Sequence, residues 1–178
     1  NLRRSVAYIS NGYLGFEMTW LDRFYQMNES MVKLSLGDKI VPISSKQEHE
    51  GGHSEGADPH YWVSPKCAMA IATSVKDLLC GLNPSGKQKY ESNYSGLIIK
   101  INETDSLARS LFSQFSGEAF MIYHPNLAYL ARDYGLNEVA VEFEGKEPPP
   151  SRLKWLIDFG QENNIKAIFV QKEYDSKN

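Results

Sequence analysis

The sequence predicts an α/β fold, and three patterns along the chain lead to that class. Residues 116–178 alternate short apolar runs, typical of strands, with amphipathic helical segments, which favours right-handed crossovers and a parallel sheet. Residues 1–58 begin in a similar way, with a strand, a helix and a second strand before a polar loop. Residues 59–115 carry apolar side chains at helical spacing and therefore predict a pair of helices.

The N-terminal segment predicts the last portion of an α/β unit. The stretch "SVAYISNG" favours a strand, "LGFEMTWLDRFYQMN" has the spacing of an amphipathic helix, and "KIVPIS" predicts another short strand. Residues 44–58 hold no apolar side chain longer than alanine, so we expect an exposed loop. Predicted strands fall close to both ends of the chain without flanking elements, and we expect an internal piece of a longer protein, truncated at both ends.

The helix pair has clear start signals. A serine and a proline at 64–65 favour a helix start, because serine caps helix N-termini and proline suits the first helical position. Apolar residues then follow at helical spacing as far as Leu82. An asparagine and a proline at 83–84 repeat the signal, and a second apolar stripe predicts one long helix from Pro84 to Phe115. At about 1.5 Å per residue, such a helix crosses most of a domain.

The last third supplies the predicted sheet. The stretches "EAFMIYH", "NEVAVEF" and "KAIFVQ" have the composition of strands. Helices are predicted between them, over Asn126–Tyr134 with Gly135 as the closing residue, and over Ser151–Asn164.

Composition and motifs exclude several classes of function. The 178 residues carry a net charge of −3 with basic side chains spread along the chain, so no nucleic-acid partner is expected. No apolar run approaches the roughly 20 residues that span a bilayer. Cys67 and Cys80 fall at opposite ends of one predicted helix, too far apart to form a disulfide. Nucleophile elbows of the G-x-S-x-G type and phosphate-binding loops are also missing from the sequence.

Potential metal ligands gather at one edge of the predicted sheet. Ligands bind outside the carboxyl ends of the strands in open parallel sheets, and the chain places His124, Glu142, Glu173 and Asp175 there. His60 lies in the turn before the first capped helix, where it could face them. Zinc accepts imidazole nitrogen and carboxylate oxygen, and a closed site takes four ligands. By spacing alone the chain offers two histidines and an acid.

Each of these residues also has an explanation that involves no metal. His124 fits a strand-end histidine that is hydrogen-bonded to the backbone, and His60 fits a solvated side chain in an Asp-Pro-His turn. Asp175 fits a turn former, while Glu142 and Glu173 fit exposed acids of a strand and a turn.

The remaining histidines lie in the polar loop. His49 and His53 stand among glycines and acids, where solvated side chains are expected rather than tight ligands. Trp62, close to His60, fits a packing anchor.

Taken together, these segments resemble the metal receptors of zinc and manganese ABC uptake systems, a family of periplasmic or lipid-anchored substrate-binding proteins. "DPHYWVSPKCAMAIA" is similar to the family's Asp-Pro-His-x-Trp-x-x-Pro motif, whose histidine is a metal ligand and maps to His60. "FMIYHPNLAYLARDYGL" resembles the segment whose histidine, or glutamate in manganese-type members, is the next ligand; here it is His124. "IFVQKEYDSKN" is similar to the family's Phe-Val-Glu segment, and in several members an aspartate just beyond it completes the site, which maps to Asp175.

The resemblance continues through the N-terminal part and has two departures. "NGYLGFEMTWLDRF" is similar to the family's asparagine-glycine, glutamate-x-x-tryptophan segment, and a variable loop, often histidine-rich, follows at "SSKQEHEGGHSEG". The family's usual glutamate after Phe-Val is Gln171 here. The family's first histidine ligand lies upstream of the segment matched by "AYISNG" and is not contained in this chain.

The resemblance implies two α/β lobes joined by one long helix, with a metal ion bound between them. It implies a receptor rather than an enzyme, which captures zinc, or alternatively Mn²⁺, and delivers it to an ABC transporter permease. We expect a monomer that is periplasmic or lipid-anchored outside the cytoplasmic membrane. Imidazole-rich ligand sets suit Zn²⁺ better than Mn²⁺, which favours oxygen ligands.

Two other functions are also compatible with the sequence. A zinc hydrolase would fill the vacant coordination position with water and use Glu142 or Glu173 as general base. A receptor-like domain that has lost metal binding would keep the fold without the complete ligand set.

Overall fold

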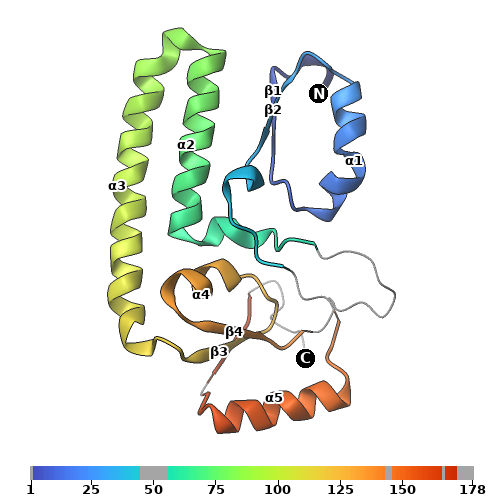
Figure 1. The fold of residues 1–178 in the computed structure, drawn as a ribbon, viewed down its shortest axis with the longest axis vertical. Helices are drawn as coiled ribbons and strands as arrows, with labels where there is room; N and C mark the ends of the chain where they lie inside the picture. Colours follow the sequence, from blue (N-terminus) through green and yellow to red (C-terminus); the bar gives the residue numbers. More distant parts are fainter. Residues whose placement is uncertain (1, 45–55, 143–145, 166, 172–178) are drawn as a thin grey trace. The chain divides into compact units, whose positions relative to one another are not determined.

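The computed structural model describes residues 2–44, 56–142, 146–165 and 167–171, and these form two compact units (Figure 1). Unit 1 holds the described residues up to Asp105, and unit 2 holds those from Ser106 onward. Helix α3, Lys87–Phe112, includes the boundary and so carries the chain from one unit into the other. The predicted α/β class and the predicted long helix are both confirmed.

Unit 1 begins with a strand, a helix and a second strand. Strand β1, Ala7–Ser10, pairs in parallel with β2, Val32–Ser35, and helix α1, Gly15–Gln26, connects them. The predicted strand "KIVPIS" is wrong, because the second strand lies earlier, at "VKLS". Pro42 has no N–H for a ladder hydrogen bond, and Ile40, which is 8% exposed, fills the core instead.

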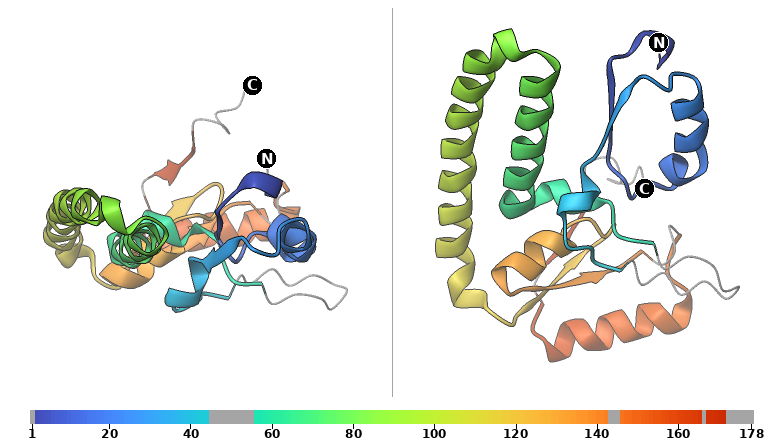
Figure 2. Two further views of the ribbon diagram at one scale, coloured as in Figure 1. Left: turned by 90° about the horizontal axis from the view of Figure 1, so that it is seen from above. Right: turned by 45° about the horizontal axis from the view of Figure 1, so that its top comes forward.

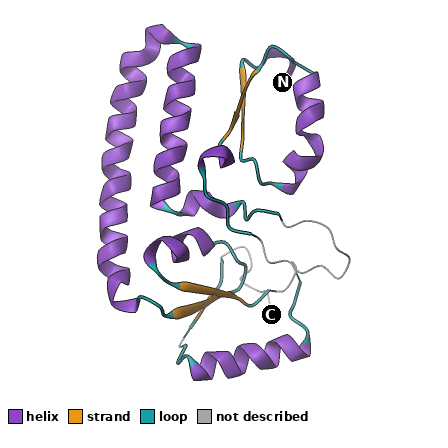
Figure 3. Cartoon of the chain, in the orientation of Figure 1, coloured by secondary structure: helices purple, strands orange, loops and turns teal. Residues whose placement is uncertain are grey.

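Two antiparallel helices complete unit 1 (Figures 2 and 3). Helix α2 spans Pro65–Leu82, the range that capping and periodicity predict. A 3-10 turn at Pro84–Gly86 then leads into α3, and another at Ser113–Phe115 follows it, so the predicted long helix is confirmed with tightened ends. Within unit 1, Thr73 Oγ1 lies 2.9 Å from the hydroxyl of Tyr94 and ties α2 to α3.

Unit 2 contains the predicted parallel sheet. Strand β3, Ala119–Ile122, lies between β4, Asn137–Ala140, and β5, Ile168–Phe169, and pairs in parallel with both. Helix α4, Ala128–Tyr134, follows β3, and helix α5, Pro150–Glu162, follows β4. The carboxyl ends of the three strands therefore meet at one edge of the sheet, as the sequence predicts.

Both units have small cores of their own. Unit 1 buries Met31, Ile40, Tyr61 and Cys67, and unit 2 buries Met121, Ile122, Tyr129, Ala131, Tyr134 and Leu156. Gly135 ends α4 in the left-handed region at φ 72°, which glycine adopts without a steric cost. Cys67 and Cys80 are free thiols, as predicted. Within the described ranges, none of the helices combines the length and apolar character that crossing a bilayer requires.

Candidate metal centre

His60 and Asp58 form a tight pair in unit 1. Asp58 Oδ1 accepts a hydrogen bond from the backbone N–H of His60 at 2.8 Å and lies 2.7 Å from the Nδ1 atom of the same residue. The Asp58 side chain is 11% exposed and that of His60 is 24% exposed. A neutral imidazole that donates from Nδ1 carries its lone pair on Nε2, so the aspartate selects Nε2 as the nitrogen that can bind a metal.

Asn11 holds the backbone that flanks His60. The side-chain Nδ2 of Asn11 donates to the backbone carbonyl of Pro59 at 3.0 Å. The backbone carbonyl of Asn11 accepts a hydrogen bond from the Tyr61 hydroxyl at 2.6 Å. Tyr61 is 1% exposed and fixes the turn in the core of unit 1. Trp62, the predicted packing anchor, is instead 48% exposed and makes an edge contact with the His60 ring at 5.4 Å. The anchor is therefore the neighbouring residue, Tyr61.

Glu17 in turn holds Asn11. Its carboxylate accepts hydrogen bonds from the backbone N–H groups of Asn11, at 3.0 Å, and Gly12, at 2.7 Å, and the residue is 3% exposed. Gly12 has a φ of +93°, and a Cβ there would lie 2.5 Å from Oγ of Ser35, so the turn requires glycine. In the sequence, these residues are visible as an Asn-Gly pair after a predicted strand, followed by a glutamate in the first turn of the next helix. That pattern alone does not predict that Glu17 and Asn11 support His60.

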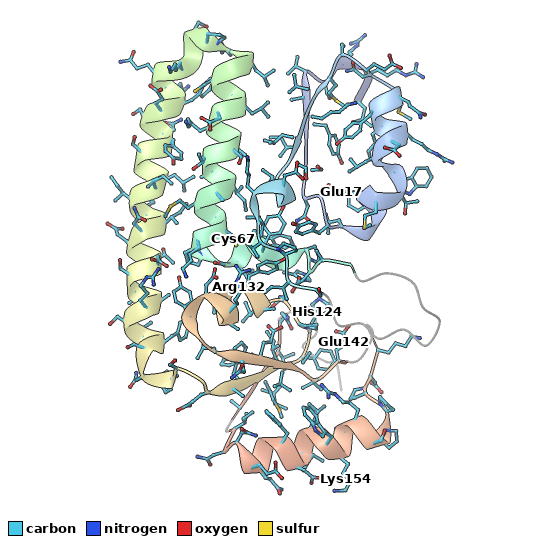
Figure 4. All side chains as sticks on the ribbon, viewed as in Figure 1. Glu17, Cys67, His124, Arg132, Glu142 and Lys154 are labelled. Atoms are coloured by element: carbon cyan, nitrogen blue, oxygen red, sulfur yellow. The ribbon has the colours of Figure 1, made fainter. Side chains whose placement is uncertain are left out.

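His124 and Glu142 form the corresponding pair in unit 2 (Figure 4). His124 follows β3, Glu142 follows β4, and Nδ1 of the histidine lies 2.8 Å from Oε2 of the glutamate. The Glu142 side chain is 8% exposed, so the expectation of an exposed strand acid is wrong. Its carboxylate again directs the Nδ1 proton and leaves the lone pair of the neutral ring on Nε2. The predicted gathering of side chains at the strand ends is confirmed for these two residues.

The third strand end contributes Gln171. Its Nε2 donates to the carbonyl of His124 at 2.8 Å, and the backbone N–H of His124 donates to its Oε1 at 3.4 Å. The segments that follow β3, β4 and β5 therefore meet at His124, which contacts both Glu142 and Gln171. The sequence marks Gln171 only as a departure from a family pattern.

The third predicted ligand, Asp175, lies outside the described residues. So do the candidate acid Glu173 and the two loop histidines, His49 and His53, for which solvated side chains are expected. Within the described part of each unit, no group of three or more His, Cys, Asp or Glu side chains lies close enough to hold a metal ion. Each unit instead offers one imidazole that is oriented by one carboxylate.

Comparison with known proteins places the chain in a family. The model of the ZnuA family, described as zinc-uptake complex component A, periplasmic, matches residues 1–178. This chain belongs to the ZnuA family. The match confirms the resemblance to metal receptors of zinc and manganese uptake systems.

Individual ZnuA-family relatives are moderately similar. The zinc-binding lipoprotein AdcA of Streptococcus pneumoniae (strain ATCC BAA-255 / R6) is 29% identical over 166 residues, which cover 86% of this chain and 33% of the lipoprotein. The high-affinity zinc uptake system protein ZnuA of Bacillus subtilis (strain 168) is 30% identical over 141 residues, which cover 75% of this chain and 44% of that protein. The chain thus spans less than half the length of these two relatives.

Solved structures of ZnuA share the fold. A crystal structure of ZnuA superposes with a TM-score of 0.80 and 31% identity over 95% of this chain and 63% of the solved chain. A zinc-bound deletion mutant of ZnuA gives a TM-score of 0.78 at the same identity and coverage. The predicted two-lobe α/β architecture of this family is therefore confirmed.

Proposed function

We propose that this chain is the zinc-capturing part of a receptor for an ABC uptake transporter. In this proposal His60 and His124 bind the ion through Nε2, Asp175 supplies a carboxylate, and zinc is the cargo rather than a resident cofactor. The receptor acts outside the cytoplasmic membrane, as a periplasmic or lipid-anchored monomer, and delivers the ion to a permease.

The observation that carries the proposal is the repeated histidine–carboxylate pair. Asp58 orients His60, and Glu142 orients His124. In these pairs a carboxylate oxygen lies 2.7 Å and 2.8 Å, respectively, from Nδ1 of the histidine. Metal-binding histidines commonly donate their second nitrogen to a carboxylate, which fixes the ring and raises its basicity as a ligand. Two imidazoles favour zinc over manganese, because Mn²⁺ prefers oxygen ligands.

The names of relatives support the cargo and the location. The matched proteins from Streptococcus pneumoniae and Bacillus subtilis are a zinc-binding lipoprotein and a high-affinity zinc uptake system protein. One solved relative is a zinc-bound ZnuA mutant. The assignment of Asp175 rests on the sequence resemblance.

A hydrolase is the weaker alternative. A general base needs a carboxylate oxygen that can reach a metal-bound water. The Glu142 side chain is only 8% exposed, and its carboxylate is hydrogen-bonded to the His124 ring. That position suits a residue that orients a ligand rather than one that moves a substrate proton.

Zinc titration of the full-length protein tests the proposal. We expect His60→Ala and His124→Ala each to weaken zinc affinity by more than about 100-fold. Replacing a residue that only orients a metal ligand typically costs up to about 100-fold, and loss of the ligand itself should cost more. The matched control replaces His49 and His53 together by alanine, and should change affinity little. If the loop pair proves essential and His124→Ala binds normally, the ligand assignment is wrong.

A further inference from the structure

The geometry points to Gln171 as a positioning residue for His124. We propose that its side-chain amide holds the main chain of His124 at both hydrogen-bonding groups, and thereby fixes where the imidazole meets the metal ion. This inference rests on the proposed function, since it takes His124 as a zinc ligand.

The amide of Gln171 continues the sheet past its last backbone pairing. Strands β3 and β5 pair through Ile122 and Phe169, and the N–H of Tyr123 still donates to the Phe169 carbonyl at 2.8 Å. At the next residue the side chain of Gln171 takes over, donating to the His124 carbonyl at 2.8 Å and accepting from its N–H at 3.4 Å. A carboxamide presents the same acceptor and donor as a peptide group, so it can act as one more rung of the ladder.

Two features make the hydrogen bonds from Gln171 important for the position of His124. The following residue is Pro125, which biases His124 toward extended backbone but has no N–H of its own to anchor the chain. On the β4 side, Oε2 of Glu142 lies 2.8 Å from Nδ1 of the His124 ring. His124 is thus fixed by its main chain from the β5 side and by its side chain from the β4 side.

Glutamate, the residue that the family usually carries after Phe-Val, would hold the main chain of His124 by one hydrogen bond instead of two. Its carboxylate can accept from the N–H of His124, but it has no hydrogen for the carbonyl. Gln171→Met keeps the length of the side chain and removes both hydrogen bonds, so it is the sharper change at this position.

The test compares zinc affinity in four forms of the full-length protein. These are the wild type, Gln171→Glu, Gln171→Met, which keeps the length without hydrogen bonds, and Gln161→Glu, a matched charge change at an exposed position on α5. Gln171→Met should weaken zinc binding about tenfold, the smallest loss typical of replacing a residue that orients a metal ligand. Gln171→Glu should weaken zinc binding less, and Gln161→Glu should not change it. The absorption bands of cobalt bound in place of zinc report ligand geometry, and should shift only in the Gln171 variants.

A second measurement does not depend on metal. Amide hydrogen exchange at His124 in the metal-free protein should be faster in Gln171→Met than in the wild type, because its acceptor is gone. A purely structural role would lower thermal stability while leaving zinc affinity and the cobalt spectrum unchanged, and that outcome overturns the inference. Normal zinc binding by His124→Ala would overturn the proposed function with it. Loss of binding in His124→Ala beside normal binding in Gln171→Met would overturn the Gln171 inference alone.

Discussion

The Nδ1 atom of His124 lies 2.8 Å from Oε2 of Glu142, although the two residues are 18 positions apart in the sequence. Parallel pairing of β3 with β4 brings them together, since each follows the carboxyl end of its strand. The contact determines which nitrogen of His124 is available to a metal ion, and the first prediction follows from it.

Replacing Glu142 by alanine should weaken zinc affinity by about 10- to 100-fold, because His124 loses the group that orients its ring. Glu142→Gln should have a smaller effect, since its amide oxygen still accepts from Nδ1. Isothermal titration against a competing chelator measures both. Glu118→Gln, at an exposed position in the same unit, is the control and should bind as the wild type does. Equal affinities of Glu142→Ala and the control would show that the pair has no role in binding.

Asp58 should matter to zinc binding in the same way in unit 1. Asp58→Asn keeps an acceptor but loses the charge that strengthens the bond to His60 Nδ1. We expect about a tenfold loss of zinc affinity, measured by the same titration. Asp22→Asn, on the exposed face of α1, removes a comparable charge and should leave binding unchanged. Wild-type affinity in Asp58→Asn would contradict the assignment of His60 as an oriented ligand.

Glu17 should contribute mainly to stability. Glu17→Ala removes the acceptor of two backbone N–H groups, those of Asn11 and Gly12, in a largely buried turn. We expect the free energy of unfolding to fall by about 1–3 kcal/mol. Urea titration measures the change, with Glu29→Ala at an exposed position as the control. Equal midpoints for the two variants would mean that water replaces the carboxylate without cost.

The pH dependence of stability should reflect Tyr13. Its hydroxyl donates to the Gly37 carbonyl at 2.7 Å, and burial raises the pKa of Tyr13 above its ordinary value, with smaller contributions from Asp38 and Cys67. The unfolded chain then loses the phenol proton first as pH rises, so the stability linked to Tyr13 is complete below about pH 10 and is lost above it. Tyr13→Phe should flatten the decline in the free energy of unfolding that begins above about pH 10. An unchanged slope would contradict the link.

Much of the fold was predictable because its signals are local. The start of α2 at Pro65 and the end of α4 at Gly135 depend on capping chemistry within a few residues, and both agree with the structure. The strand at Val32–Ser35 was missed, because a short apolar run becomes a strand only through pairing with a distant segment. "KIVPIS" has the composition of a strand, but among the described residues its only bridge is the isolated antiparallel one between Ser44 and Ala57.

The sequence by itself determined the class of fold, the long helix, and the placement of His60 before a capped helix and of His124 at a strand end. Only the tertiary structure decided the partners of these histidines: Asp58 with its support from Asn11 and Glu17 in unit 1, and Glu142 and Gln171 in unit 2. The physical reason is the range of the interactions. Helical periodicity and capping act over a few neighbouring residues, whereas a buried carboxylate or amide finds its partner only after strands far apart in sequence have aligned in register.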